Sequence, residues 1–427
     1  MELKTLHSLF LKCNAVCTDT RKLQKNDMFF GLKGENFNGN EYAEKALEMG
    51  ADYAIVDEAA YNTSSKTILV DDVLKTLQEL ASFHREYLNV PIIALTGSNG
   101  KTTTKELINA VLSQKYETTA TIGNLNNHIG VPLTLLSMTN KTEIGIVEMG
   151  ANHLKEITFL CNIAKPDYGY ITNFGKAHLE GFGGVEGVIK GKSEMYDHLI
   201  AHNKTIIINT NDAIQVEKTK NAKTFSFGKS NQTSDVNIEF VAALPLVRCS
   251  YNGLEIKSQL IGDYNFNNIS AAIAIGNYFK VEDNLIKTAI ESYTSSNNRS
   301  QIIQKGSTKI ILDAYNANPT SMNAALLNFE QQTGKKIAIL GDMFELGKEA
   351  KQEHQNIADL ATSMGIDEII FVGENFYQAI VSSKKAKQYK SFSEFESNFD
   401  LSNIENATLL IKGSRGMALE RTLELLN

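Results

Sequence analysis

Short apolar runs rich in β-branched residues alternate along the chain with longer stretches in which apolar residues recur every three or four positions. The first pattern is typical of buried strands, and the second of amphipathic helices. Regular alternation of the two predicts an α/β protein built on parallel sheets. The runs that we predict to be strands are 28–32, 53–56, 90–95, 144–149, 168–173, 205–209, 310–313, 336–340, 368–372 and 407–411.

These elements divide the chain into three domains. Residues 1–88 form a small N-terminal α/β domain, with helices predicted at 42–49 and 73–87. Residues 89–296 form a central P-loop-type domain, a parallel sheet with helices on both faces. Residues 297–427 form a Rossmann-like α/β domain that has no phosphate loop of its own.

The central domain is expected to end in an antiparallel edge followed by a helix. Apolar runs at 236–241 and 254–260 flank the turn Tyr251-Asn252-Gly253, which predicts a hairpin between the two runs. An alanine-rich helix is predicted at 265–279.

Composition and charge narrow the classes of function. Of the 427 residues, 42% are hydrophobic and 21% charged, which is typical of a soluble enzyme. The net charge of −7 gives no basic footprint for nucleic acid, and no apolar run is long enough to span a membrane. Residues 1–4 lack the pattern of a signal peptide. Four cysteines in so long a chain form no disulfide framework, so we expect a cytoplasmic protein, and a monomer.

One stretch carries a phosphate-binding signature. Residues 96–104 (Thr-Gly-Ser-Asn-Gly-Lys-Thr-Thr-Thr) join the predicted strand at 90–95 to an amphipathic helix at 105–112. A strand, a glycine-rich loop and a helix in this order are the context of a P-loop, although two residues rather than four separate these glycines. The alternative is a glycine-rich turn with an incidental lysine, which the order of the elements disfavours.

Each residue type in this loop has a physical role in binding phosphate. Gly97 and Gly100 let the backbone approach an anion closely, and the helix N-terminus directs N–H groups and its positive dipole end toward it. Lys101 can reach the terminal phosphates of a nucleotide. The hydroxyl of Thr102 can ligate Mg²⁺.

Polar residues at the ends of predicted strands add candidate ligands. Glu148, Asn173 and Asn209 all end strands, where the carboxyl edge of a parallel sheet forms a ligand crevice. Thr102 and Glu148 would suit Mg²⁺, which prefers oxygen ligands. His178 follows another strand, but its spacing alone favours a polar loop residue over a metal ligand.

Several segments together resemble the Mur ligase family, the ATP-dependent amide-bond ligases of cell-wall precursor synthesis. The segments that carry the resemblance are 96–103, 126–132, 148–150, 177–183, 313–319, 340–347 and 412–416, in the family's order and across nearly the whole chain. The resemblance implies an ATP-dependent ligase that joins D-alanyl-D-alanine to UDP-N-acetylmuramoyl-tripeptide through an acyl phosphate, in peptidoglycan synthesis. It leaves open whether the third residue of the peptide is lysine or a diaminopimelate.

The resemblance also implies residue roles. Catalytic residues would be Lys101, Glu148, His178 and Lys192. ATP would be bound by Gly97, Ser98, Asn99, Gly100, Lys101, Thr102, Thr103, Asn265, Asn268, Arg299, Asp313 and Asn316. Substrates would be bound by Thr20, Arg21, Asn126, Asn127, Ser414 and Arg415. Two Mg²⁺ sites would use Thr102, Glu148, His178 and Lys192, with Lys192 carbamylated.

Alternatives stay open at several positions. Asn265 and Asn268 could cap the alanine-rich helix instead of binding adenine. Thr20 stands where the family usually has serine, and Asn38-Gly39-Asn40 stands where it has Asp-Gly-His; by composition alone, the segments 18–21 and 33–40 are more typical of turns than of binding sites. Other functions to weigh are a ligase that adds glutamate to folate, a simple P-loop phosphotransferase and an inactive nucleotide-binding scaffold.

Overall fold

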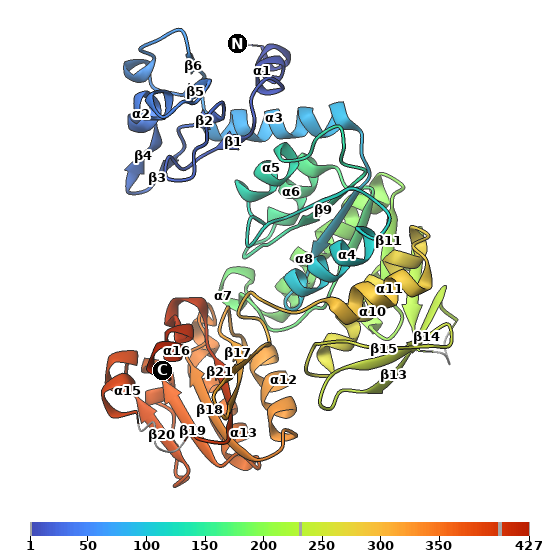
Figure 1. The fold of residues 1–427 in the computed structure, drawn as a ribbon, viewed down its shortest axis with the longest axis vertical. Helices are drawn as coiled ribbons and strands as arrows, with labels where there is room; N and C mark the ends of the chain where they lie inside the picture. The colour runs from blue at the N-terminus through green and yellow to red at the C-terminus, as the bar shows by residue number, and fades with distance from the viewer. Residues whose placement is uncertain (1, 230–232, 400–403, 427) are drawn as a thin grey trace.

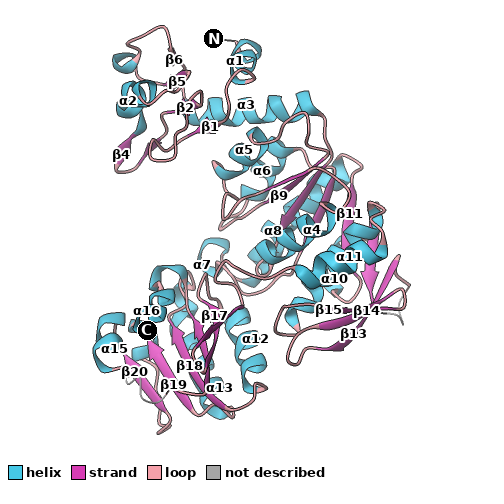
Figure 2. Ribbon diagram, in the orientation of Figure 1, coloured by secondary structure: helices cyan, strands magenta, loops and turns pink. Residues whose placement is uncertain are grey.

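The computed structural model describes residues 2–229, 233–399 and 404–426 (Figure 1). Their strands fall into three main sheets, which Figure 2 shows as separate groups along the molecule. Four strands form the first sheet, nine the central sheet and six the third, with a small β3–β4 hairpin beside the first. The three-part α/β architecture expected from the sequence is therefore confirmed.

The first sheet is parallel, in the order β1-β2-β5-β6. The elements of this region are α1 (Leu3–Phe10), β1 (Val16–Cys17), β2 (Met28–Phe30), β3 (Lys33–Gly34), β4 (Phe37–Asn38), η1 (Gly39–Tyr42), α2 (Ala43–Glu48), β5 (Tyr53–Val56), η2 (Ala59–Tyr61), β6 (Thr67–Leu69) and α3 (Val73–Leu88).

The long helix α3 joins the first region to the central one (Figure 1). Asp72 caps it by accepting from the Lys75 N–H at 2.8 Å. Leu77 and Leu80 are fully buried, and each such side chain contributes about 2 kcal/mol of hydrophobic stabilisation. At the far end, the Arg85 guanidinium donates to the Asp167 carboxylate at 2.7 Å, which fixes α3 to the central domain.

The central sheet has the order β15-β14-β13-β12-β11-β10-β7-β9-β8. Its elements are β7 (Ile92–Thr96), α4 (Lys101–Leu112), β8 (Thr118–Ala120), α5 (Gly130–Leu136), β9 (Ile144–Glu148), α6 (Glu156–Ala164), β10 (Tyr168–Ile171), α7 (Leu179–Phe182), α8 (Val185–Ala201), β11 (Thr205–Asn209), α9 (Ala213–Lys218), β12 (Thr224–Gly228), β13 (Val236–Ala242), β14 (Arg248–Tyr251), β15 (Leu254–Lys257), α10 (Tyr264–Tyr278) and α11 (Asp283–Ser292).

Helices cover both faces of this sheet, as predicted. Successive side chains of a strand point to opposite faces. Ile93 and Leu95 of β7 belong to the core formed with α4, α10 and α11. Ile92 and Ala94 belong to the core formed with α5, α6 and α8. The loops after β7, β9 and β10 therefore leave the sheet at one edge, between two layers of helices.

Two sequence-based predictions in this domain were wrong in detail. The hairpin was expected to pair 236–241 directly with 254–260, but β14 lies between them and pairs antiparallel with both β13 and β15. The phosphate-loop helix was expected from residue 105, but α4 begins at Lys101. The antiparallel edge itself, at β13 to β15, is where the sequence predicted it.

The third sheet has the order β16-β17-β21-β18-β19-β20, parallel except for β16. Its elements are β16 (Gln301–Lys305), β17 (Thr308–Asp313), α12 (Pro319–Glu330), β18 (Lys335–Gly341), η3 (Gly347–Glu349), α13 (Ala350–Ser363), β19 (Glu368–Val372), α14 (Glu374–Tyr377), β20 (Ala386–Tyr389), α15 (Phe392–Asn398), β21 (Ala407–Lys412), η5 (Arg415–Met417), η6 (Leu419–Arg421) and α16 (Thr422–Leu425). The sequence missed the two edge strands, β16 and β20.

Among the described helices, none is both long enough and apolar enough to cross a membrane. All four cysteines are free thiols.

Candidate functional site

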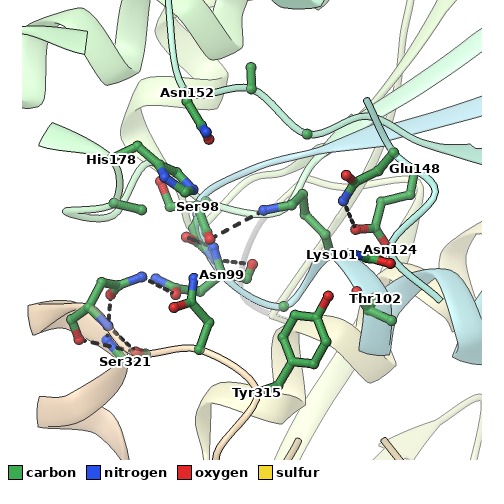
Figure 3. A pocket seen from close by; sticks show the side chains of 18 of the residues that line it. Ser98, Asn99, Lys101, Thr102, Asn124, Glu148, Asn152, His178, Tyr315 and Ser321 are labelled. Carbon is green, nitrogen blue, oxygen red and sulfur yellow. Dashed lines mark hydrogen bonds between the residues drawn. The ribbon is translucent and has the colours of Figure 1, made fainter. Parts of the chain in front are cut away.

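A cavity of about 800 Å³ lies between the central and third domains. Its central wall comes from the loops after β7, β9 and β10, at the carboxyl edge of the sheet, where ligands of such sheets bind. Its other wall comes from the loop after β17, including Asp313, Tyr315 and Asn318. Figure 3 shows Lys101, Thr102 and Glu148 grouped on one side of this cavity.

The two glycines of the predicted phosphate loop are required by its shape. Gly97 has a φ of 141°, and a Cβ there would lie 2.0 Å from the Thr172 hydroxyl. Gly100 has a φ of 80°, and a Cβ there would lie 2.6 Å from the Asn268 side-chain oxygen. Any other residue at either position would clash and adopt a rare backbone conformation. Gly97 itself does not line the cavity, whereas Ser98, Asn99, Gly100, Lys101, Thr102 and Thr103 do.

Helix α4 begins in the cavity wall, so its first turn is an anion site. The N–H groups of a first helical turn lack partners within the helix, and the positive end of the dipole lies there. The Lys101 ammonium donates to the Gly97 carbonyl at 2.6 Å. Burial lowers the pKa of Lys101, and the nearby Glu148 carboxylate partly offsets this. Among the described residues this half-buried cation bonds only to carbonyls of the loop, and a bound phosphate would supply a negatively charged partner.

Two buried oxygens of cavity-lining residues in and beside the loop have no hydrogen-bond partner among the described residues. They are the Thr102 hydroxyl and the Glu148 Oε2 atom. The other Glu148 oxygen accepts from the Asn126 side chain at 2.8 Å, and the Glu148 N–H donates to the Thr121 hydroxyl at 3.0 Å. Leaving a buried polar atom unpaired costs about 1–3 kcal/mol. The two unpaired oxygens therefore indicate a site for a ligand that would bind to both of them.

Asn126 and Asn127, predicted to bind substrate, both line the cavity. Asn126 is held against Glu148, as described above. Asn127 accepts from the N–H groups of Ile129 and Gly130, at 3.1 and 2.9 Å, at the start of α5. The observed contacts therefore give these two residues structural partners on the cavity wall, and they leave the predicted substrate contact a prediction.

His178 lies in the same cavity, and its partner is an acid of the third domain. Its Nδ1 atom is hydrogen-bonded to the carboxylate of Glu345. This bond lowers the pKa of Glu345 more than burial raises it. Two residues away, the Lys176 ammonium pairs with Glu353 of α13 at 2.6 Å. The loop after β10 therefore makes two charged contacts across the domain interface.

Lys192 is fully buried in α8 behind the cavity wall. Its ammonium donates to the Ala151 carbonyl at 3.0 Å and lies 5.1 Å from the centre of the Phe182 ring. Burial, and next the charge of Lys101, hold the pKa of Lys192 well below its usual range. Ala151 lines the cavity and Lys192 does not.

The third-domain residues predicted to reach the nucleotide all line the cavity. The Arg299 guanidinium lies 3.6 Å from the centre of the Tyr315 ring, and its Nε is buried without a partner among the described residues. Asp313 accepts from the Lys412 ammonium at 2.6 Å and from the Ser300 N–H at 3.0 Å. Asn316 is exposed to the cavity.

Asn265 and Asn268 form a buried chain of hydrogen bonds. The Asn265 side chain donates to the Ile261 carbonyl at 2.7 Å and accepts from the Asn268 amide at 2.8 Å. Asn268 in turn accepts from the Thr104 hydroxyl of α4 at 3.0 Å. Both line the cavity and both lie within α10, whose N-cap residue is Asp263, so the alternative of a simple helix cap was wrong.

Other predicted residues lie away from the cavity. Asn209 was expected at the crevice, but its side chain contacts Asn211 and Asn267 instead, because β11 is two strands from β7. Ser414 is buried, accepts from the Phe344 N–H at 2.9 Å and does not line the cavity. The exposed Arg415 pairs with Glu420 at 2.8 Å.

Thr20 and Arg21 lie in the first domain, outside the cavity. The Arg21 guanidinium makes three hydrogen bonds with Asp19, of which the two shortest join Nε to one carboxylate oxygen at 2.9 Å and Nη2 to the other at 2.8 Å. Asn38 ends β4 and caps the 3-10 helix η1, which contains Asn40, and the side-chain bonds of both residues are internal to that domain. Of the segment 33–40, predicted to be a turn, only residues 35–36 form one, between β3 and β4.

Among the cavity residues to which the sequence assigned no role, four third-domain residues stand out: Tyr315, Asn318, Glu345 and Lys412. The Asn318 side chain donates to the Asn99 oxygen at 2.7 Å and so joins the third domain to the phosphate loop. All four stand in segments that carry the family resemblance. Their position in these segments could have marked them as candidate site residues. The contacts that each of them makes could not be predicted, because they depend on how the domains meet.

Comparison with known proteins agrees over the whole length. Residues 12–85 match the profile described as Mur ligase family, catalytic domain, residues 95–276 that of the Mur ligase middle domain, and residues 298–415 that of the Mur ligase glutamate ligase domain. A Bacillus subtilis protein named UDP-N-acetylmuramoyl-tripeptide--D-alanyl-D-alanine ligase is 36% identical over 96% of this chain and 92% of its own. An Escherichia coli protein of the same name is 32% identical over 97% and 93%.

Solved structures agree as well. MurF from Acinetobacter baumannii superimposes with a TM-score of 0.87 at 30% identity, covering 99% of this chain and 98% of its own. MurF ligase from Thermotoga maritima in complex with ADP superimposes with a TM-score of 0.84 at 25% identity, covering 98% and 97%. The matches agree with the shortened phosphate loop and with the cavity shared by the central and third domains. The chain therefore belongs to the Mur ligase family.

Proposed function

We propose that this chain is an ATP-dependent ligase that joins D-alanyl-D-alanine to UDP-N-acetylmuramoyl-tripeptide in peptidoglycan synthesis. The observation that carries the proposal is the cavity in which Lys101, Thr102 and Glu148 face Arg299 and Asp313 of another domain. Relatives with this activity in their names match nearly the whole chain. The complex of the Thermotoga maritima relative with ADP supports use of ATP.

The proposed reaction activates a carboxylate, which is otherwise a poor electrophile. The carboxylate of the tripeptide attacks the γ-phosphorus of ATP, and the bond to the β,γ-bridging oxygen breaks to release ADP. The amine of D-alanyl-D-alanine then attacks the acyl carbon, loses a proton and expels inorganic phosphate. Lys101 and the first turn of α4 stabilise the negative charge that phosphoryl transfer concentrates.

The residues present fit a bound Mg²⁺. The Thr102 hydroxyl and Glu148 Oε2 are buried oxygen donors that lack protein partners among the described residues, and Mg²⁺ prefers such ligands. When bound, the ion would neutralise phosphate charge. His178 would serve a second site, together with a carbamate on Lys192. Carbamate formation needs an unprotonated amine, and the lowered pKa of Lys192 favours that form.

Water must be kept from the acyl phosphate, which hydrolyses readily. The third domain already contacts the phosphate loop through Asn318 and Asn99, at 2.7 Å, and the loop after β10 through Glu353 and Lys176. Asn99 and Asn318 line the cavity and so join its two walls, whereas Lys176 and Glu353 lie outside the lining. We propose that closure of this domain excludes water during the reaction.

The substrates are assigned to domains on the same basis. The first domain (1–88), through Thr20 and Arg21, would bind the UDP end. The central domain (89–296) would bind ATP. The third (297–427), through Ser414 and Arg415, would receive the dipeptide. We also propose a cytoplasmic monomer, because free thiols suit a reducing compartment and one chain supplies both walls of the cavity.

A phosphate-release assay tests the proposal. ATP, D-alanyl-D-alanine and UDP-N-acetylmuramoyl-tripeptide with lysine or a diaminopimelate in third position should together give phosphate and a ligated product. Omitting the dipeptide should leave only slow or reversible ADP formation. No release with either tripeptide would overturn the proposal, and release with a folate and glutamate would replace it. Isotope exchange between ADP and ATP that needs the dipeptide would contradict an acyl phosphate formed first.

A further inference from the structure

Glu345 lies in a segment of the third domain, 340–347, whose role the proposed reaction leaves unexplained. Its carboxylate accepts a hydrogen bond from His178 Nδ1, and its backbone carbonyl accepts from the Glu180 N–H at 3.3 Å. Both members of the side-chain pair have left-handed backbones, with φ of 54° at His178 and 62° at Glu345. Residues other than glycine adopt this region at a cost, so the surrounding fold holds both partners of the bond in place.

The chemistry of the pair fixes where the imidazole carries its proton. A carboxylate can only accept a hydrogen bond, so Nδ1 of His178 must be the donor. In a neutral ring, the other nitrogen, Nε2, is then a bare acceptor. Among the described residues Nε2 has no hydrogen-bond partner, and His178 lines the cavity.

We infer that Glu345 is a positioning residue that acts across the domain interface: it selects the Nδ1–H form of His178 and so presents the Nε2 lone pair to a metal ion. The inference rests on the proposed function, in which His178 serves the second metal site. A carboxylate behind a metal-binding histidine orients the ring and raises its basicity. Because this carboxylate comes from the third domain, the ligand is fully formed only when that domain is closed.

A simpler explanation is that Glu345 only helps to hold the two domains together. The same loop offers a matched control for that explanation. Lys176 pairs with Glu353 of α13 at 2.6 Å, an ion pair across the same interface that does not contact His178. A variant at Glu353 therefore weakens the domain contact and leaves the histidine bond intact.

The first experiment reads the proton position directly. Nitrogen-15 NMR of labelled protein with ADP, at about pH 8, distinguishes a ring that carries its proton on Nδ1 from one that carries it on Nε2. His178→Gln identifies the signal among the eight histidines. We expect the Nδ1–H form in the wild type, in Glu345→Gln, whose carbonyl oxygen still accepts, and in Glu353→Gln. We expect Glu345→Ala to lose it.

The second experiment measures turnover of the same variants. Glu345→Ala should lower kcat by about 10–100-fold, the usual cost of losing such a partner. Glu345→Gln and Glu353→Gln should stay within about 5-fold of the wild type. An Nε2–H ring in the wild type, an unchanged ring and rate in Glu345→Ala, or an equal loss in Glu353→Gln would each overturn the inference. A wild type that releases no phosphate would instead overturn the proposed function, and the NMR result would still stand by itself.

Discussion

Two glycine- and asparagine-rich segments of this chain look alike in sequence and differ in how their polar groups are paired. One is the segment 38–40, where β4 ends in the tight turn of the 3-10 helix η1, and the other is the phosphate loop at 97–100. In the turn, Asn40 is completely buried and donates to the side chains of Asn38 and Asp57, each at 2.9 Å. It also accepts from the Asp57 N–H at 2.9 Å. Every hydrogen-bonding atom of its side chain thus has a protein partner.

The phosphate loop and the residues beside it show the opposite state. The Thr102 hydroxyl and Glu148 Oε2 are buried without partners among the described residues, and Lys101 reaches only loop carbonyls. Such groups cost stability unless a ligand pairs with them. The difference teaches that saturation of the buried polar atoms, rather than the content of glycine and asparagine, separates a structural turn from a binding site.

The largest expected effect comes from removing the cation of the phosphate loop. Lys101→Ala should lower kcat/KM by about 1000-fold or more, because its charge acts on the transferring phosphoryl group. Its melting temperature should not fall, since the half-buried lysine loses solvation and, among the described residues, its ammonium bonds only to loop carbonyls. Phosphate release and thermal melting measure the two quantities. Wild-type turnover by a folded Lys101→Ala protein would contradict the assignment of this loop as the phosphate-binding site.

The next effect concerns Lys192. Lys192→Ala should lose about 100-fold in turnover, and a short carboxylic acid added to the assay should restore part of it by replacing the carbamate oxygens. Lys190→Ala is the matched control, because Lys190 is exposed on the same helix and should lose little. Mass spectrometry under bicarbonate that finds only plain lysine, together with full activity of Lys192→Ala, would exclude a carbamate ligand.

A smaller effect, on the stability of the protein rather than on its turnover, is expected in the first domain. Asn40→Ala should lower the free energy of unfolding by about 2 kcal/mol, because it leaves the Asp57 N–H without its partner and removes one donor each from the Asp57 carboxylate and the Asn38 oxygen. Its kcat should not change. Asn36→Ala, at an exposed neighbour, should change neither quantity. Denaturant unfolding and the phosphate assay separate the outcomes, and a loss of turnover with normal stability would place this turn on the substrate.

The smallest effect is a pH dependence at the same turn. Burial raises the pKa of Asp57, but hydrogen bonds from Lys33, Asn40 and the Val73 N–H outweigh it, so the net pKa lies below its usual value. The ionised carboxylate therefore stabilises the fold above the unfolded pKa of about 4, and this contribution is lost as pH falls through the lower folded value. Between pH 6 and pH 3 the wild type should lose more melting temperature than Asp57→Asn. An equal loss would show that the bonds do not favour the charged form.

The sequence predicted the sheets better than their edges. Continuous apolar runs such as Ile92–Thr96 and Ile144–Glu148 become buried central strands, and both were identified. Strand β14, Arg248–Tyr251, was missed because only Cys249 and Tyr251 are buried, and four alternating residues next to a turn give a weak signal. Helix α4 starts four residues early, since packing of Thr104 against Asn268 overrides the low helix propensity of threonine.

The site was predictable where it is local and missed where it is not. The phosphate loop is local, because its residues lie within six positions of one another: Gly97, Gly100, Lys101 and Thr102. Their shared role can therefore be recognised from the sequence. The bond between His178 and Glu345 joins residues 167 positions apart in different domains. No periodicity or spacing encodes such a pair, because it exists only once the domains have met.

The continuous helix α3 also has a consequence for substrate length. Its 16 residues span about 24 Å; at its start the Val73 N–H donates to the Asp57 carboxylate of the first domain at 3.2 Å, and near its end Arg85 fixes it to the central domain. If the UDP end of the substrate is held in the first domain, as proposed, the helix fixes the distance between that end and the phosphate loop. A peptide shorter by one residue would then leave its carboxylate about 3.5 Å short of the γ-phosphate.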